Sequence, residues 1–118
     1  MPEYVMLYRN TAAASDASSD SPEQLQQRMQ KWRAWFDELQ GKGELKSIGQ
    51  PLEGGGRLVA GKKKLITDGP YAETKDLIGG YSLIQARDLD HAAKIASGCP
   101  ILESGGSVEV RPVRQMTL

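Results

Sequence analysis

The alternation of hydrophobic and polar positions predicts two helices and several strands, and the first helix is the clearest element. Ser21 is placed to cap it, Pro22 stands at its first helical position, and Gln24 completes a capping box. Gly41 and Gly43 provide its end. Apolar residues recur at spacings of three and four, which predicts a stripe packed against a sheet. That stripe consists of Leu25, Met29, Trp32, Phe36 and Leu39, widened by Trp35.

Short runs of aliphatic and aromatic residues predict the strands. The chain opens with such a run, and a small-residue, polar stretch at residues 10–21 follows it as a surface loop. Glycines 54–56 are predicted to form a turn, because no Walker-type lysine or helix follows them. Lysines 62–64 suit the solvated tip of a hairpin. The predicted strands are residues 4–9, 45–50, 57–60, 64–67, 78–86 and 108–113.

A second helix is predicted after the buried strand at 78–86. Asp88 is its cap, and Gly98 with Pro100 ends it. Its predicted apolar face consists of Leu89, Ala92, Ala93 and Ala96. The last strand alternates, so its valines face one side while Glu109 and Arg111 face the other.

This order of elements predicts an α+β fold, a ferredoxin-like βαββαβ sandwich with an extra hairpin. Both helices would cover one face of the sheet. The other face carries mixed apolar and polar residues, and a second copy could cover it by packing sheet against sheet. We therefore expect a homodimer of a single domain that spans residues 1–118.

Charge and composition exclude several classes of protein. Lysine plus arginine (15) equals aspartate plus glutamate (15), so no net charge attracts nucleic acid or an anionic membrane. Apolar runs are short and the first residues do not resemble a signal peptide, which predicts a cytoplasmic protein. One cysteine and one histidine supply neither a disulfide nor an ordinary zinc site. No metal and no cofactor are predicted.

The candidate chemistry lies around a forced turn, where a Gly-Pro pair follows Asp68 at a strand end. Asp68 and Glu73 are the candidate catalytic carboxylates, since a carboxylate near Lys75 is the minimum for proton transfer on a small molecule. Tyr71 and Tyr81 are candidate binding residues, with Lys75. The structural alternatives are local hydrogen bonding by the carboxylates and sealing of a core edge by the phenol rings.

Three further residues have a structural and a functional interpretation. Arg111 either neutralises Glu109 at a sheet surface or dimer seam, or binds an anionic substrate group through its guanidinium. His91 falls on the predicted polar face of the second helix, which favours a solvated residue over a general base. Cys99, with no histidine partner apparent, is predicted to be a small buried apolar residue.

With these residues in hand, the chain resembles the YCII-related family, in the branch named for its Asp-Gly-Pro-Phe motif. The resemblance covers nearly the whole chain, and Tyr71 replaces the usual phenylalanine. It rests on the opening strand, Met29, Trp32 and Phe36, Asp68 to Lys75, Gly79-Gly80-Tyr81, Asp88-Leu89-Asp90, Cys99-Pro100, and Glu109 to Val113.

The resemblance implies a ferredoxin-like fold of the dimeric α/β-barrel type. Some relatives are described as using a histidine and aspartate pair for acid-base chemistry, and one branch is a dehydrochlorinase of a chlorinated aromatic. Here the first loop has no histidine and His91 lies on another element, so that pair is not carried over to this chain.

Two function hypotheses follow. The first is a small-molecule-binding homodimer that takes an anionic or aromatic ligand and catalyses proton transfer or elimination, with Asp68 as base and Lys75 or Arg111 holding the anion. The second is a non-catalytic regulatory or interaction module whose turn residues pair within the dimer. Genes of this branch lie beside sigma factors, which would link such a module to sigma-factor-dependent transcription. The sequence does not decide whether the protein is an enzyme.

Overall fold

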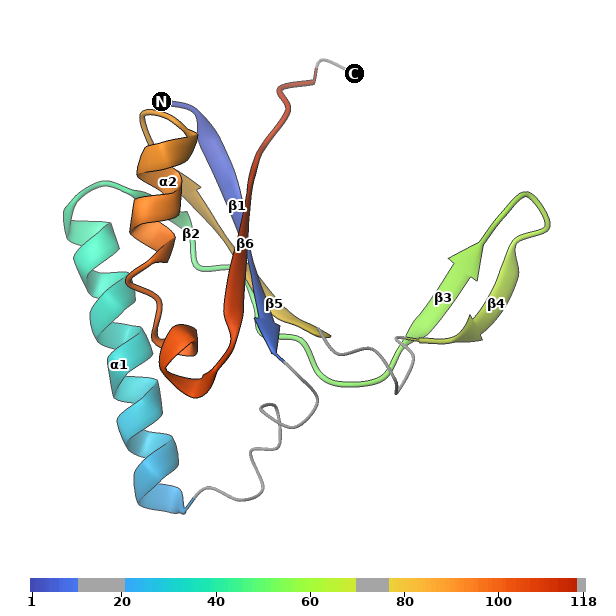
Figure 1. Cartoon of the computed structure of the whole chain (residues 1–118), viewed down its shortest axis with the longest axis horizontal. Helices are drawn as coiled ribbons and strands as arrows, with labels where there is room; N and C mark the ends of the chain where they lie inside the picture. Colours follow the sequence, from blue (N-terminus) through green and yellow to red (C-terminus); the bar gives the residue numbers. More distant parts are fainter. Residues whose placement is uncertain (11–20, 70–76, 117–118) are drawn as a thin grey trace.

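In a computed structural model, which describes residues 1–10, 21–69 and 77–116, a four-stranded antiparallel sheet packs against two helices (Figure 1). The strand order β2-β5-β1-β6 is that of the ferredoxin-like βαββαβ motif, and β3 with β4 forms the extra hairpin. The predicted fold is therefore confirmed. The elements are β1 (Glu3–Asn10), α1 (Pro22–Gly41), β2 (Leu45–Ser47), β3 (Arg57–Ala60), β4 (Leu65–Asp68), β5 (Leu77–Gln85), α2 (Leu89–Ala96), the 3-10 helix η2 (Pro100–Ser104) and β6 (Ser107–Pro112).

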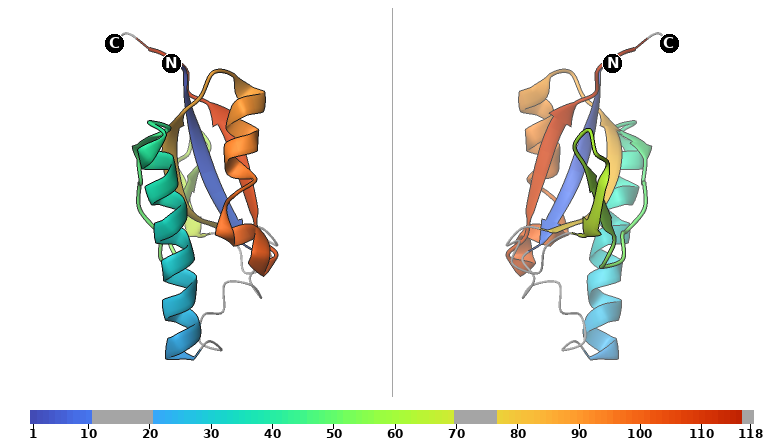
Figure 2. Two further views of the ribbon diagram at one scale, coloured as in Figure 1. Left: turned by 90° about the vertical axis from the view of Figure 1, so that its left-hand side faces the viewer. Right: turned by 90° about the vertical axis from the view of Figure 1, so that its right-hand side faces the viewer.

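Both helices cover the same face of the sheet, as predicted (Figure 2, left). Side chains alternate along β1, so Tyr4, Met6 and Tyr8 are buried against the helices while the residues between them face the other side. The valines of β6 pack against the same core. The core consists of Tyr4, Met6, Tyr8, Trp35, Leu39, Ile84, Ala86, Ala92, Ile95, Ala96, Cys99 and Ile101.

Helix α1 begins as its sequence predicts, but its apolar stripe is only half buried. The Ser21 hydroxyl accepts from the Gln24 amide at 3.1 Å and the Gln24 side chain accepts from the Ser21 amide at 2.9 Å. Residues 22–31 are exposed because this half of α1 runs past the sheet (Figure 1), which leaves Met29 66% exposed. The predicted burial of Leu25 and Met29 is therefore wrong. Among the described residues, no helix is long and apolar enough to cross a membrane.

The buried face of α2 also differs from the predicted one. Asp88 caps the helix as expected, accepting from the His91 amide at 2.8 Å. The buried residues are Ala92, Ile95 and Ala96, which follow helical spacing. Ala93 is turned out of this stripe, and Leu89, in the first turn, stays exposed. The predicted face is therefore correct for Ala92 and Ala96 and wrong for Leu89 and Ala93.

Glycines allow a short segment to cross close to β5. After β2, the chain runs beside β5, and the Leu52 amide donates to the Gly79 carbonyl at 2.8 Å. A Cβ on Gly80 would lie 3.2 Å from the Gln50 carbonyl oxygen. Gly49 has a φ of 68°, and a Cβ there would lie 1.9 Å from the Tyr81 carbonyl oxygen. Close backbone approach therefore explains Gly80 and Gly49.

Candidate functional site

Asp68 ends β4, as predicted, but it lies on the hairpin and not in a cleft. Its Oδ1 is 3.2 Å from Nη1 of Arg57, and its side chain is 92% exposed. Such an exposed ion pair contributes little to stability. Glu73, Lys75 and Tyr71, the other candidates of this motif, lie outside the described residues.

Tyr81 and Arg111 lie on the sheet face that the helices leave uncovered. Leu7 is paired with Tyr81 on one side and with Glu109 on the other, which places all three on that face. Glu109 contacts two arginines: Arg9 at 2.8 Å and Arg111 at 3.9 Å. The contact with Glu109 favours the interpretation in which Arg111 neutralises that carboxylate at the sheet surface. Within the described part of the chain, no hydrogen bond or ion pair joins Asp68 to Tyr81 or Arg111.

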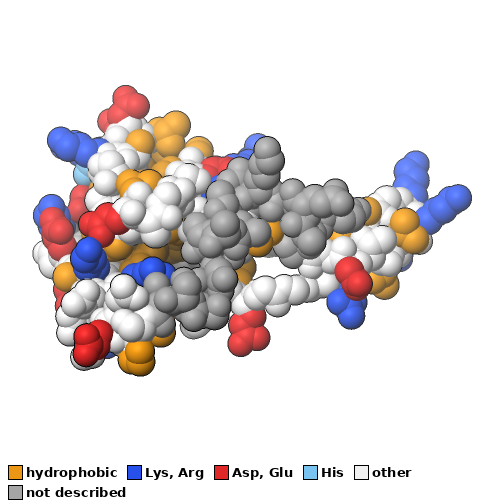
Figure 3. Space-filling view, turned by 60° about the horizontal axis from the view of Figure 1, so that its bottom comes forward, with side chains coloured by type: hydrophobic (Ala, Val, Ile, Leu, Met, Phe, Trp, Pro, Cys, Tyr) orange, Lys and Arg blue, Asp and Glu red, His pale blue; other side chains and the backbone are white. Residues whose placement is uncertain are grey.

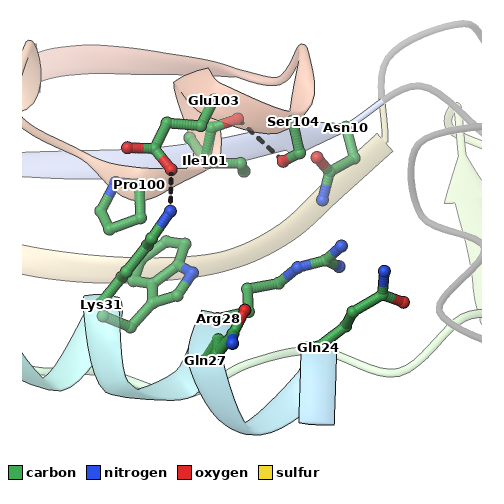
Figure 4. Close-up of a pocket in the computed structure, with 10 residues that line it drawn as sticks. Asn10, Gln24, Gln27, Arg28, Lys31, Pro100, Ile101, Glu103 and Ser104 are labelled. Carbon is green, nitrogen blue, oxygen red and sulfur yellow. Dashed lines mark hydrogen bonds and ion pairs between the residues drawn. The ribbon is translucent and has the colours of Figure 1, made fainter. Parts of the chain in front are cut away.

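A groove of about 290 Å³ lies elsewhere, between α1 and η2. Figure 4 shows Arg28 and Lys31 reaching from α1 toward residues of η2 and the end of β1. The ammonium of Lys31 is 2.8 Å from Oε2 of Glu103, and both side chains are more than half exposed. The described lining residues are Asn10, Gln24, Gln27, Arg28, Lys31, Trp32, Pro100, Ile101, Glu103 and Ser104.

The chemistry of this groove suits binding. Two cationic side chains and several amide side chains can donate hydrogen bonds, and the partly buried Trp32 supplies an aromatic surface. The Ser104 hydroxyl already donates to the Ile101 carbonyl at 3.1 Å, so it can offer a ligand only its oxygen as an acceptor. Glu103 is the one carboxylate among the described lining residues, and it is already paired with Lys31. The groove therefore favours an anionic ligand with a planar apolar part.

The sequence contains a polar stripe on α1 that indicates one wall of this groove. Apolar periodicity alone does not reveal it. Gln24, Gln27, Arg28 and Lys31 follow spacings of three, one and three, which place them on one helix face. This polar stripe runs along the half of α1 that extends past the sheet. The facing wall, η2, comes from a distant part of the sequence, so its proximity could not be read from spacing.

Two buried groups are held in their neutral forms by the core. Cys99 is 2% exposed, which confirms the predicted buried residue, and burial raises the pKa of its thiol to about 12. The Tyr8 hydroxyl donates to Oγ of Ser82 at 2.7 Å, and burial raises the pKa of Tyr8. The Ser82 hydroxyl in turn donates to the Ile48 carbonyl at 2.7 Å. Cys99 and Tyr8 are therefore part of the buried core.

His91 is not the solvated residue that the sequence predicted. Its side chain is 18% exposed, and its Nε2 lies 3.0 Å from Oε2 of Glu44. The Arg87 amide donates to its Nδ1 at 3.1 Å, so Nε2 carries the hydrogen that is donated to Glu44. Glu44 lies between α1 and β2, far from His91 in sequence, so helical periodicity could not reveal this partner.

Comparison with known proteins identifies the family. A model of the YCII-related domain matches residues 3–117. The chain belongs to the YCII-related family. No curated protein gives a significant match. Among solved structures, the chain is similar to the 5-chloro-2-hydroxyhydroquinone dehydrochlorinase from Burkholderia phenoliruptrix in complex with 2,5-dihydroxybenzoquinone. That match has 19% identity and a TM-score of 0.48, and it covers 97% of this chain and 95% of the other. The Asp-Gly-Pro-Phe branch stays a prediction.

Proposed function

We infer that this YCII-related protein is a homodimer that binds a small anionic, aromatic molecule in the groove between α1 and η2. The observation that carries this proposal is the groove itself, where Lys31 and Arg28 face amide and hydroxyl groups beside the ring of Trp32. A cavity volume of about 290 Å³ is close to the lower end of the range for small-molecule sites. The location differs from the turn after Asp68, where the sequence pattern placed the candidate chemistry.

An aromatic carboxylate satisfies this chemistry best. Its carboxylate can accept from Lys31 or from Arg28, and its ring can lie against the apolar lining of Trp32 and Ile101. Glu103 competes for Lys31, since its Oε2 already lies 2.8 Å from the ammonium. Anionic ligands must therefore displace or share this contact, which predicts modest affinity.

The test is a thermal-shift screen of small aromatic carboxylates and phenols on the wild-type chain and on Lys31→Gln. Arg33→Gln is the matched control, because Arg33 is exposed on the same helix, carries the same charge and does not line the groove. A ligand at about 100 times its Kd should stabilise the wild type and Arg33→Gln by about 2.7 kcal/mol. Lys31→Gln should lose most of this stabilisation.

Equal losses in both variants would show a general charge effect and contradict the groove as the site. If no compound stabilises any of the three proteins, the alternative function gains support, namely a non-catalytic interaction module.

Acid-base activity is the second part of the proposal, and it can be tested separately from binding. Asp68 offers an accessible carboxylate beside Arg57. Because Asp68 does not line the groove, we place this activity, proton transfer or elimination with Asp68 as base, on a molecule held beside the β3–β4 hairpin. If Asp68→Asn binds ligand normally and keeps full turnover of a substrate found by the screen, Asp68 is not the base.

Homodimer formation is supported by the sheet face opposite the helices, where apolar residues of β1 and β5 remain only half buried. Sedimentation of the wild-type chain at micromolar concentration should give twice the mass of the 118-residue chain.

A further inference from the structure

The hairpin of β3 and β4, here named the arm, stands away from the body of the protein (Figure 1). Its strands pair with each other from Arg57 opposite Asp68 to Ala60 opposite Leu65, and they form a sheet separate from the main one. The radius of gyration is 16.0 Å, whereas a compact domain of this length has about 13 Å. The chain is therefore extended by this projection.

The arm is apolar on both of its faces. Val59 and Ile66 are directly opposite each other on one face, and Leu58 and Leu65 lie on the other. These four side chains are between 44% and 64% exposed. A two-stranded hairpin is at best marginally stable alone in water, so an arm with this surface needs a cover.

A second uncovered apolar surface lies on the same side of the molecule. The sheet face opposite the helices carries Val5, Leu7 and Leu83 at its centre, beside the 38% exposed Tyr81. In the right-hand view of Figure 2 the arm stands in front of this face, and in Figure 1 it diverges from it. The space between the two surfaces opens outward.

The charges of the arm lie only at its ends. Arg57 and Asp68 pair at its base, and lysines 62–64 form its outer tip (Figure 3), while the residues between are uncharged. On the sheet, the charged cluster of Arg9, Glu109 and Arg111 lies to one side of the apolar centre. The uncharged middle of an arm can therefore meet the apolar centre of a sheet without burying an unpaired charge.

We propose that the arm of each chain packs on the open sheet face of a second copy. In a two-fold dimer, each chain places its arm on the sheet face of the other, so both arms and both sheet faces are covered at once. A partner that offered only one complementary surface would leave either the arm or the sheet face exposed. This inference rests on the homodimer in the proposed function and adds its specific contact. It also places the arm residue Asp68 next to the partner's sheet.

Cross-linking of two tagged variants tests the exchange. Ile66→Cys on the arm is mixed with Leu83→Cys on the sheet face, and a short bismaleimide is added. The native Cys99 is buried and does not compete. Gln26→Cys, exposed on α1, replaces Leu83→Cys as the matched control. The expected result is a covalent product that contains both tags. Its yield with Leu83→Cys should be at least about ten times the yield with Gln26→Cys.

Sedimentation of the same samples separates this inference from the homodimer. A dimer without the cross-link would overturn the arm contact and leave the homodimer standing. A link formed within one chain of the double variant Ile66→Cys/Leu83→Cys, at concentrations where the protein sediments as a monomer, would show that the arm closes on its own sheet. Monomers at all concentrations would overturn both statements.

Discussion

Replacing Tyr8 and Ser82, singly and together, tests the hydrogen-bond chain that ties the core to the segment after β2. The Tyr8 hydroxyl donates to Ser82, and Ser82 donates to the Ile48 carbonyl, each at 2.7 Å. Tyr8→Phe keeps the aromatic ring, which packs edge-on against Trp32 with 5.0 Å between the ring centroids, and removes one hydrogen bond. This should cost about 1 kcal/mol of unfolding free energy.

Ser82→Ala should cost more, because it leaves the buried Tyr8 hydroxyl without its acceptor. An unsatisfied buried hydroxyl costs about 1 to 3 kcal/mol, and the Ile48 carbonyl also loses its donor, so we expect about 2 kcal/mol. The double variant removes both polar groups together and should cost about the same as Ser82→Ala alone. The coupling energy is then about 1 kcal/mol.

Urea titration of the four proteins at neutral pH measures this cycle. If the cost of the double variant equals the sum of the two single costs to within about 0.3 kcal/mol, the two hydroxyls are not energetically coupled. That result would contradict the proposed hydrogen-bond chain. A Tyr8→Phe cost above that of Ser82→Ala would reverse the reasoning about which group is left unsatisfied.

Two further predictions concern the core and its edge. Gly49→Ala should lower the unfolding free energy by about 3 kcal/mol or more, because φ is 68° and the added Cβ would lie 1.9 Å from the Tyr81 carbonyl oxygen. Gly41→Ala, with no atom within 4 Å of its Cβ, should be neutral or slightly stabilising when both variants are measured by the same urea titration. Burial raises the pKa of the Cys99 thiol to about 12, above its ordinary value of 9.0. The unfolded chain therefore loses this proton first as pH rises, and the stability falls. Between about pH 8 and pH 10 the wild type should lose about 1 kcal/mol more than Cys99→Ala, and parallel losses would contradict this.

The fold could be predicted from the sequence because its signals are local. Ser21, Pro22 and Gln24 specify the start of α1 through bonds within one turn, and the alternation along β6 places its valines against the core. Errors arose where burial depends on distant elements. Met29 follows the apolar period of α1 but lies beyond the edge of the sheet, and no local pattern encodes where a sheet ends.

The candidate site was less predictable for the same reason. The sequence emphasised Asp68, which the structure places on an exposed arm, whereas the groove is formed by α1 and η2, about 70 residues apart, as in the pair of Lys31 with Glu103. His91 similarly gains Glu44 as a partner only through the tertiary fold. Helical period could identify the polar stripe, but not the wall that faces it.

The most direct test of the proposed function is the location of the ligand, measured by amide chemical shifts. A wild-type chain labelled with nitrogen-15 is titrated with the carboxylate that gives the largest thermal shift. Binding in the groove predicts that the largest changes occur at Gln24, Gln27 and Ser104, with little change at Tyr81 and Arg111. The largest changes at Tyr81 and Arg111 instead would place the ligand on the open sheet face and contradict the proposed site.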